Sequence, residues 1–297
     1  MKIILSGASG FVGTALVEDL RSRGAEVLTL VRRPAKPNGN ERRWAPDRGE
    51  LEPDIISGAD AVINLNGRSI ADGRWTSTVK AQLRSSRLES TRTIVEAIGR
   101  AEQPPALLIN ASATGFYGDR GGERLDETSD PGDGFLADLT VDWENAAAEA
   151  ASPRTRVVCL RLGMVLGDGG ALDRMLTPFK LGLGGPMGNG RQFWPWITIA
   201  DVAGAVGHTL ATSEVDGPVN LVTPEPVTSK GFARALGKHL GVPAVVPAPA
   251  FAVKLALGEM AEELLLASAK VHPGVLSDTG YEFRAPTLAQ AFRQILG

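Results

Sequence analysis

Residues 1–13 read MKIILSGASGFVG, and this stretch decides the fold. Its apolar run at 3–5 predicts a short buried strand. Residues 7–13 then have the spacing G-x-x-G-x-x-G, and apolar residues recur after them at helical intervals. A strand, a glycine turn and a helix in this order can bind the pyrophosphate of a dinucleotide, because the first turn of a helix offers unpaired N–H groups to an anion. The amino end is therefore predicted to be a dinucleotide-binding β-α unit.

Each glycine of this loop has its own role. Gly7 permits the tight turn, Gly10 lets the backbone approach the phosphates because it has no Cβ, and Gly13 lets the helix pack closely on the strand. An ordinary β-α turn could match the glycine spacing, but the strand and helix beside it favour the cofactor site. The residues expected to contact the cofactor here are Gly7, Ser9, Gly10, Phe11, Val12 and Gly13.

The second predicted strand ends in the sequence VRRP (31–34), without a carboxylate. An NAD site usually has an acidic residue at this point, which accepts hydrogen bonds from the adenosine ribose. Two guanidinium groups can instead pair with the 2′-phosphate of NADP, because their planar fork suits a phosphate. The arginine pair stands about twenty residues past the glycine loop and therefore favours NADP(H), with Arg32 as the main ligand and Arg33 as the second. The alternative is a pair of solvated surface arginines.

The composition is that of an ordinary globular protein. The chain has 297 residues, of which 43% are hydrophobic and 22% charged, and a formal net charge of -3. The sequence has no basic stripe for nucleic acid, and its single cysteine, Cys159, rules out an internal disulfide. Neither a secretory leader nor an apolar run of membrane-spanning length is recognisable, so we expect a cytoplasmic protein. The three histidines are scattered along the chain, and we expect no metal site.

Predicted strands and helices alternate along most of the chain. This pattern indicates an α/β fold with a Rossmann-type, doubly wound parallel sheet. Strands are expected at 27–31, 42–44, 61–65, 106–110, 156–162 and 219–222, and helices at 76–98, 135–151 and 198–210. The regular alternation of strand and helix patterns ends after Gly163, and residues 182–190 are too rich in glycine for a regular element.

Two lobes are expected. Residues 1–165 should form the NADP-binding Rossmann domain, and residues 198–223 should return to it. Residues 166–197 and 224–297 should form a smaller, mainly helical lobe on the substrate side.

Several segments carry a resemblance to a known family. The GASGFVG loop, the turn NLNG (64–67) and the stretch ASA (111–113) resemble an extended short-chain dehydrogenase/reductase. Longer motifs are similar to those of its atypical, sugar-nucleotide-epimerase-like subgroup, namely ADGRWT (71–76), GFYG (115–118), DWENAA (142–147), RLGMVLGDGGAL (161–172), LGLGGPMGNGRQFWPWI (181–197) and GPVNLVTPEPVTSKGFARAL (217–236). The resemblance implies a doubly wound NADP-binding domain with a small C-terminal domain of unknown function, and it implies no particular reaction. Further cofactor contacts are expected at Leu65, Asn66, Gly67 and Gly163.

The usual proton relay of that superfamily is missing. Its standard members place a lysine four residues after a tyrosine, and the lysine lowers the pKa of the phenol. At that distance from Tyr117 the chain has Gly121, and at that distance from Tyr281 it has an alanine. The remaining candidates for catalysis are the hydroxyl groups of Ser112, Thr114 and Tyr117. The first two could instead be cap or turn hydroxyls, and Tyr117 could simply pack or contact the nicotinamide.

The segment 184–197 has the features of a substrate-binding wall. It combines glycines with Arg191, which could bind a phosphate or carboxylate, and with Trp194 and Trp196, which could form an apolar wall. We expect one of these two tryptophans in the cleft and the other buried. Trp75 is a second candidate for the cleft. The alternative is that the tryptophans belong to the core.

Three functions remain open at this point. The chain could be an NADP-dependent oxidoreductase or epimerase that acts on an unidentified small molecule. It could be a non-catalytic NADP(H)-binding sensor or regulatory protein, as the missing tyrosine–lysine pair would suggest. A scaffold without cofactor fits the glycine loop and the arginine pair least well. We expect a monomer or homodimer that binds neither nucleic acid nor membrane.

Overall fold

Seven parallel strands form one sheet in the computed structural model, which describes residues 1–37 and 39–297. The strands are ordered β11-β7-β5-β4-β1-β2-β3, so the order reverses between β1 and β4. Their bounds are β1 (Lys2–Ser6), β2 (Glu26–Val31), β3 (Glu41–Arg43), β4 (Ala61–Asn64), β5 (Leu107–Ala113), β7 (Arg156–Leu162) and β11 (Gly217–Leu221). Ligands of such sheets bind outside the carboxyl ends of the strands, at the point of reversal. The predicted Rossmann-type, doubly wound fold is confirmed.

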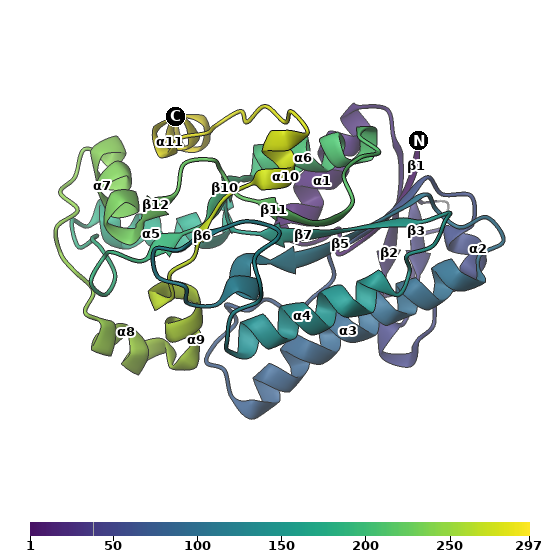
Figure 1. Cartoon of the computed structure of the whole chain (residues 1–297), viewed down its shortest axis with the longest axis horizontal. Coiled ribbons are helices and arrows are strands. Elements are labelled where there is room, and N and C mark those ends of the chain that lie inside the picture. Colours follow the sequence, from purple (N-terminus) through teal and green to yellow (C-terminus); the bar gives the residue numbers. More distant parts are fainter. Residues whose placement is uncertain (38) are drawn as a thin grey trace.

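Helices cover both faces of the sheet (Figure 1). The helices on one face are α1 (Phe11–Ser22), α6 (Ile199–Ala211) and α10 (Gly274–Asp278), and those on the other are α2 (Pro53–Ile56), α3 (Ser77–Arg100) and α4 (Phe135–Ala148). Successive strand residues point to opposite faces, so Ile3 packs below α1 and α6 while Ile4 packs below α2 and α3. Because both faces are covered, the strands are almost continuously apolar.

The remaining elements gather beyond the carboxyl ends of the strands (Figure 1). The helices there are α5 (Gly170–Lys180), α7 (Ser229–Leu240), α8 (Ala250–Leu257), α9 (Glu259–Ala261) and α11 (Leu288–Leu296), with the π turn η3 (Glu262–Leu266). Short strands pair in twos: β8 (Met164–Gly167) with β10 (Trp196–Thr198), β9 (Phe193–Trp194) with β12 (Val227–Thr228), and β6 (Arg124–Leu125) with β13 (Lys270–Val271). The part of the chain after residue 224 is thus mainly helical, as predicted.

Two carboxylates, one buried and one half-buried, attach the C-terminal part to the rest of the fold. Asp201, near the start of α6, accepts hydrogen bonds from the backbone N–H groups of Arg284 and Ala285 at 2.7 and 3.2 Å. Glu263, from η3, accepts from the first two N–H groups of α4 at 3.0 and 2.7 Å. A carboxylate at a helix N-terminus is favourable because it complements the helix dipole. These contacts fix the C-terminal helices relative to the carboxyl edge of the sheet.

Most predicted elements are found with shifted ends. The strand expected at 106–110 continues to Ala113, and the helix expected at 135–151 ends at Ala148. The third strand is confirmed at Glu41–Arg43, next to the short 3-10 turn η1 (Pro46–Arg48). Within the described residues no helix combines the length and apolar character needed to cross a membrane.

Candidate active site

The glycine loop after β1 leaves no room for side chains at two positions. Gly7 has a φ of +77°, and a Cβ there would lie 2.7 Å from the backbone carbon and oxygen of Leu65. A Cβ on Gly13 would lie only 2.1 Å from the carbonyl oxygen of Gly7. The loop is closed by a hydrogen bond from Gly10 N to Gly7 O at 3.1 Å. The close packing of α1 on β1 and β4 therefore depends on glycine.

The first turn of α1 has no side-chain cap. Gly10 is the N-cap residue, and the N–H groups of Phe11 and Val12 have no acceptor among the described residues. Such groups normally bind a side chain, water or an anion. The Phe11 ring points elsewhere and packs against three glycines of the β8–α5 turn, Gly167, Gly169 and Gly170. The loop thus presents backbone donors, while the Phe11 side chain is used for packing.

The two arginines after β2 differ in their partners. Arg33 donates to both carboxylate oxygens of Glu41 at 2.8 and 2.7 Å. This pair, together with the N–H group of Lys36, lowers the pKa of Glu41 to about 2. Arg32 is exposed and makes no hydrogen bond or ion pair within the described part of the chain. Of the two arginines after β2, Arg32 is therefore the one without a protein partner in the described part of the chain.

A groove of about 360 Å³ runs between α1 and the connection from β2 to β3. It is lined by Ala8, Thr14, Val17, Arg21, Thr29, Lys36, Gly39, Asn40 and Glu41. Ala8 belongs to the glycine loop of residues 7–13, which we call the cradle, so the groove begins at the cradle. The basic side chains of Arg21 and Lys36 make its wall attractive to an anion.

Polar side chains cross the carboxyl ends of the central strands on the face covered by α3 and α4. Ser6 donates to Asn64 at 2.6 Å, and Asn64 donates to Asn110 at 2.7 Å and to Thr91 at 2.9 Å. Trp143 from α4 donates to the same Thr91 hydroxyl at 2.9 Å. Ser6, Asn64, Thr91 and Asn110 are fully buried. Because buried polar groups are costly unless they are paired, this network fixes how the strand ends and α3 fit together.

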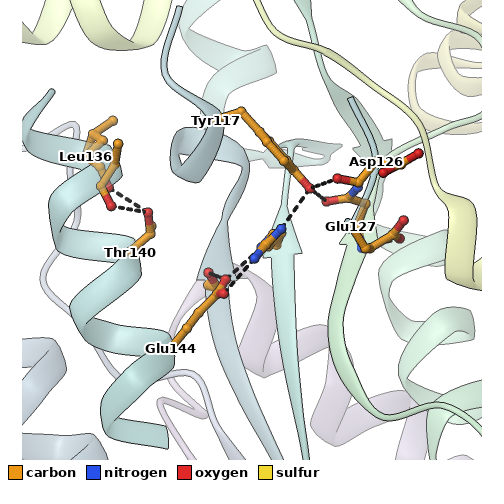
Figure 2. Close-up of polar contacts among 10 residues, drawn as sticks. Tyr117, Asp126, Glu127, Leu136, Thr140 and Glu144 are labelled. Carbon is orange, nitrogen blue, oxygen red and sulfur yellow. Dashed lines mark hydrogen bonds and ion pairs between the residues drawn. The ribbon is translucent and has the colours of Figure 1, made fainter. Parts of the chain in front are cut away.

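The same row continues across β5, β7 and β11. Ser112, Arg161 and Asn220 are neighbours in register on these strands. Glu144 from α4 accepts from Ser112 Oγ at 2.5 Å and from two nitrogens of Arg161 at 2.9 and 2.8 Å. Figure 2 shows Glu144 and Tyr117 pointing toward each other from opposite sides of this row. The ion pair between Glu144 and Arg161 lies at the centre of the network.

Tyr117, in the 3-10 turn η2 (Thr114–Tyr117), is fully buried. Its hydroxyl accepts from Arg161 Nη1 at 3.0 Å and lies 2.7 Å from Asn220 Oδ1, to which it donates (Figure 2). Burial raises the pKa of the phenol to about 12. The Arg161 guanidinium also lies 3.5 Å from the centroid of the Phe116 ring. The structure thus holds the phenol neutral and inside the protein.

The other predicted hydroxyls also have protein partners. Ser112, in β5, is 2% exposed, and its proton is directed to Glu144. Thr114 is 9% exposed and donates to the carbonyl oxygen of Leu162 at a long 3.3 Å. The three residues lie close together in the chain, at the end of β5 and in η2. Ser112 and Tyr117 are linked by hydrogen bonds through Glu144 and Arg161, whereas Thr114 is not part of this network.

The predicted substrate wall is more enclosed than expected. Trp194 and Trp196 are 7% and 1% exposed, so the expected difference between them is not observed. Both line a narrow gap that has no room for a water molecule, with Phe193, Pro195, Thr223, Glu225, Pro226, Ala269 and Val271. Pro195 also lies against Gly163, because a Cβ on Gly163 would be 2.8 Å from its carbonyl oxygen. This segment therefore reaches the carboxyl edge at Gly163.

The remaining two predicted substrate residues lie apart from each other. Arg191 is exposed just before β9. Trp75 is 8% exposed, donates to the carbonyl oxygen of Ile70 at 2.9 Å and packs on Phe135 at the start of α4. The structure does not bring Trp75 into contact with the gap lined by Trp194 and Trp196.

The sequence and the fold of this chain match known proteins. A family model described as the NAD dependent epimerase/dehydratase family matches residues 3–221. This chain belongs to that family. A second model, a domain of unknown function (DUF1731), matches residues 248–295 of this epimerase-family chain. The resemblance drawn from the motifs is confirmed, including the C-terminal domain.

Relatives in the epimerase family are similar over their whole length. The chain is 40% identical over 290 residues to the epimerase family protein Mb2239 of Mycobacterium bovis, covering 97% of this chain and 95% of that protein. It is 39% identical over 300 residues to the human epimerase family protein SDR39U1, covering 100% of both. A crystal structure of the human protein with NADPH has a TM-score of 0.92 and 37% identity, and covers 99% of both chains.

Sequence reasoning missed two members of the polar network of this epimerase-family chain, Arg161 and Asn220. It named Glu144, with Asp138, as a possible acid on the helix of residues 135–151, but favoured a solvated helical face for both. A signal was present for Arg161, because it is a charged residue inside the apolar strand VVCLRL, and such residues are rarely buried without a partner. Glu144 lies on a helical face that the sequence alone cannot distinguish from a solvated one. Its role follows only from the packing of α4 against β5 and β7.

Proposed function

We propose that this chain binds NADP(H) at the carboxyl edge of its sheet and uses it as an oxidoreductase or epimerase on a small molecule. The proposal rests mainly on the difference in partners between the two arginines that follow β2. Arg33 is held by Glu41, whereas Arg32 is exposed beside the glycine loop without a partner in the described residues. A guanidinium in this position suits the 2′-phosphate of NADP(H). The NADPH in the crystal structure of the human relative supports the same choice.

The residues around the cradle fit a dinucleotide. The uncapped first turn of α1 offers N–H groups for the pyrophosphate, and Gly7 and Gly13 keep the cradle open because a Cβ at either would collide with backbone. NADP(H) supplies a hydride donor or acceptor, and the chain binds and orients it. The residues proposed to hold it are Gly7, Ser9, Gly10, Phe11, Val12, Gly13, Arg32, Leu65, Asn66, Gly67 and Gly163, with Arg33 in a supporting position.

Ser112 is the proposed contact for the reacting oxygen of the substrate. Because its proton is directed to Glu144, its lone pairs are left to accept a hydrogen bond from a substrate hydroxyl. Thr114, whose hydrogen bond to Leu162 is long, is the second candidate. Tyr117 we assign a positioning role, since its phenol holds Arg161 and Asn220. Arg191, Trp75, Trp194 and Trp196 are the proposed substrate-side residues.

A second function, an NADP(H)-binding sensor without turnover, is favoured by one specific observation. The Tyr117 phenol and the Ser112 hydroxyl are both engaged in buried hydrogen bonds, and the pKa of the phenol is raised rather than lowered. A proton relay needs a group whose pKa lies near the working pH. The network therefore supports binding more directly than it supports proton transfer.

Two measurements test the proposal and separate the candidates. Calorimetric titration of the purified protein should give tighter binding of NADPH than of NADH, and equal or tighter binding of NADH would contradict the cofactor assignment. The NADPH-loaded protein is then incubated with carbonyl compounds and sugar nucleotides. Turnover that is lost in Ser112→Ala but kept in Tyr117→Phe supports the enzyme, whereas silence across the panel with tight NADPH binding supports the sensor.

A further inference from the structure

Arg87, on the sheet-facing side of α3, lies directly against the turn that follows β4. A Cβ on Gly67 would be 3.3 Å from both Cγ and Cζ of Arg87, so the guanidinium occupies the space that a side chain at Gly67 would need. Gly67 itself is exposed, and Arg87 is half-buried. The guanidinium therefore stands at the rim of the carboxyl edge, beside a loop that we propose to contact the cofactor.

The Arg87 guanidinium has few partners. It donates from Nη1 to the carbonyl oxygen of Leu83 at 3.0 Å and lies 5.0 Å from the centroid of the Trp143 ring. In the described residues no carboxylate lies within 4 Å of it. Burial lowers the pKa of Arg87 to about 10, and no negative charge opposes that shift. The remaining N–H donors of the fork have no acceptor in the described structure.

The other enclosed arginines are paired. Arg161 donates through two nitrogens to Glu144, and Arg156 donates to the carbonyl oxygens of Val215 and Thr209. A cation that is partly removed from water without a counterion costs stability. Proteins retain such costs mainly where binding or catalysis needs them. Arg87 is therefore a candidate for contact with an anionic ligand.

The position of Arg87 is fixed by its neighbours on α3. One turn further along, Thr91 binds Asn64 and Trp143 at the strand ends. One residue earlier, Ser86 Oγ accepts from the N–H group of Arg68 at 3.0 Å and so holds the turn after β4. Arg87 lies between these two attachments. Its fork thus has a defined place on the rim, between the β4 turn and α4.

We propose that Arg87 binds the carboxylate or phosphate group of the substrate, an inference that rests on the proposed function. The planar fork of arginine matches either group with two parallel hydrogen bonds. The pyrophosphate of the cofactor has its own donors at the first turn of α1, next to the contact of Gly7 with Leu65. The substrate class is accordingly a small molecule that carries an anionic group.

Oxalate and inorganic phosphate, titrated separately into the NADPH-saturated protein by calorimetry, test this assignment. The variants are Arg87→Met and Arg87→Lys, with Arg92→Met as the matched control, because Arg92 is exposed on the same helix. We expect Arg87→Met to weaken binding of at least one probe by about tenfold or more, Arg87→Lys to weaken it less, and Arg92→Met to leave it unchanged. We also expect the Tm of Arg87→Met to equal or exceed that of the wild type, because an uncompensated buried charge is removed.

Four results would overturn the inference. The wild-type protein binding neither probe, or Arg87→Met binding both as the wild type does, would remove the anion site. A loss of NADPH affinity in Arg87→Met of about tenfold would assign the arginine to the cofactor instead. A lowered Tm in that variant, with unchanged probe binding, would give it a structural role. Failure of the wild type to bind NADPH at all is a separate result and contradicts the proposed function itself.

Discussion

The Arg161 guanidinium and the Glu144 carboxylate form a two-point ion pair at the end of the central strands, with N···O distances of 2.9 and 2.8 Å. Their side chains are 4% and 14% exposed. Ser112 donates a further hydrogen bond to the Glu144 carboxylate, and the Tyr117 hydroxyl accepts one from the Arg161 guanidinium. These four side chains form a closed electrostatic unit, and its members depend on one another.

Replacing Glu144 with alanine should destabilise the fold strongly. The change leaves Arg161 buried without its counterion, and breaking a buried pair in this way costs about 3–5 kcal/mol. Asp142→Ala is the matched control. Asp142 lies on α4, like Glu144, but it pairs with Arg84 of α3 near the surface, and such pairs contribute about 0–1 kcal/mol. Urea denaturation measures both. An equal loss of unfolding free energy in the two variants would show that the pair of Glu144 with Arg161 stabilises the fold no more than a surface pair does.

Gly13→Ala should displace α1 and disrupt the cradle. The added Cβ would stand 2.1 Å from the carbonyl oxygen of Gly7, which is far inside contact distance. We expect NADPH affinity to fall by about tenfold or more, measured by fluorescence titration. Gly99→Ala, at a helical position where a Cβ meets nothing within 4 Å, is the control. It should leave binding unchanged and add about 0.5–1 kcal/mol of stability.

The chain contains two tyrosines, and both should resist ionisation while the protein is folded. Burial raises the pKa of Tyr117 to about 12 and raises that of Tyr281 as well. An unfolded tyrosine loses its proton near pH 10. Between about pH 10 and 12 the unfolded state therefore binds fewer protons than the folded state, and stability falls as the pH rises. The absorbance of phenolate near 295 nm should appear only as the protein unfolds. A smooth titration at pH 10 in the folded protein would contradict the burial of the phenols.

The parts of this molecule that follow from local chemistry could be predicted from its sequence. The loop at Gly7–Gly13 and the order of strands and helices depend on nearest neighbours and on periodicity, and both are found. The sequence predicted Arg32 as the main phosphate ligand and Arg33 as the second. It could not give the reason, because the partner of Arg33 is Glu41, on the next strand. The family resemblance was visible because its motifs are long.

The network and the tryptophans depend on tertiary packing and could not be predicted. Glu144 meets Arg161 only because α4 crosses β5 and β7 at that point. Trp194 and Trp196 were expected to differ in exposure, but β9 pairs with β12 and β10 with β8, and Phe232 from α7 packs on Trp194. Both faces of the segment are thus covered. Side chains two positions apart in a regular strand point to the same face, so strand periodicity gives no reason to expect a difference between the two tryptophans, and it does not predict what covers each face.

The most direct test of the account is the ratio of the dissociation constants for NADH and NADPH in the wild type, Arg32→Met and Arg33→Met, measured at one fixed ionic strength. The wild type should favour NADPH, and Arg32→Met should lower the ratio by about tenfold or more because a charge-assisted hydrogen bond to phosphate is lost. Arg33→Met should change it less, since Arg33 is already paired with Glu41. A ratio that Arg32→Met leaves unchanged would contradict the assignment of the 2′-phosphate to Arg32 and, with it, the choice of NADP(H).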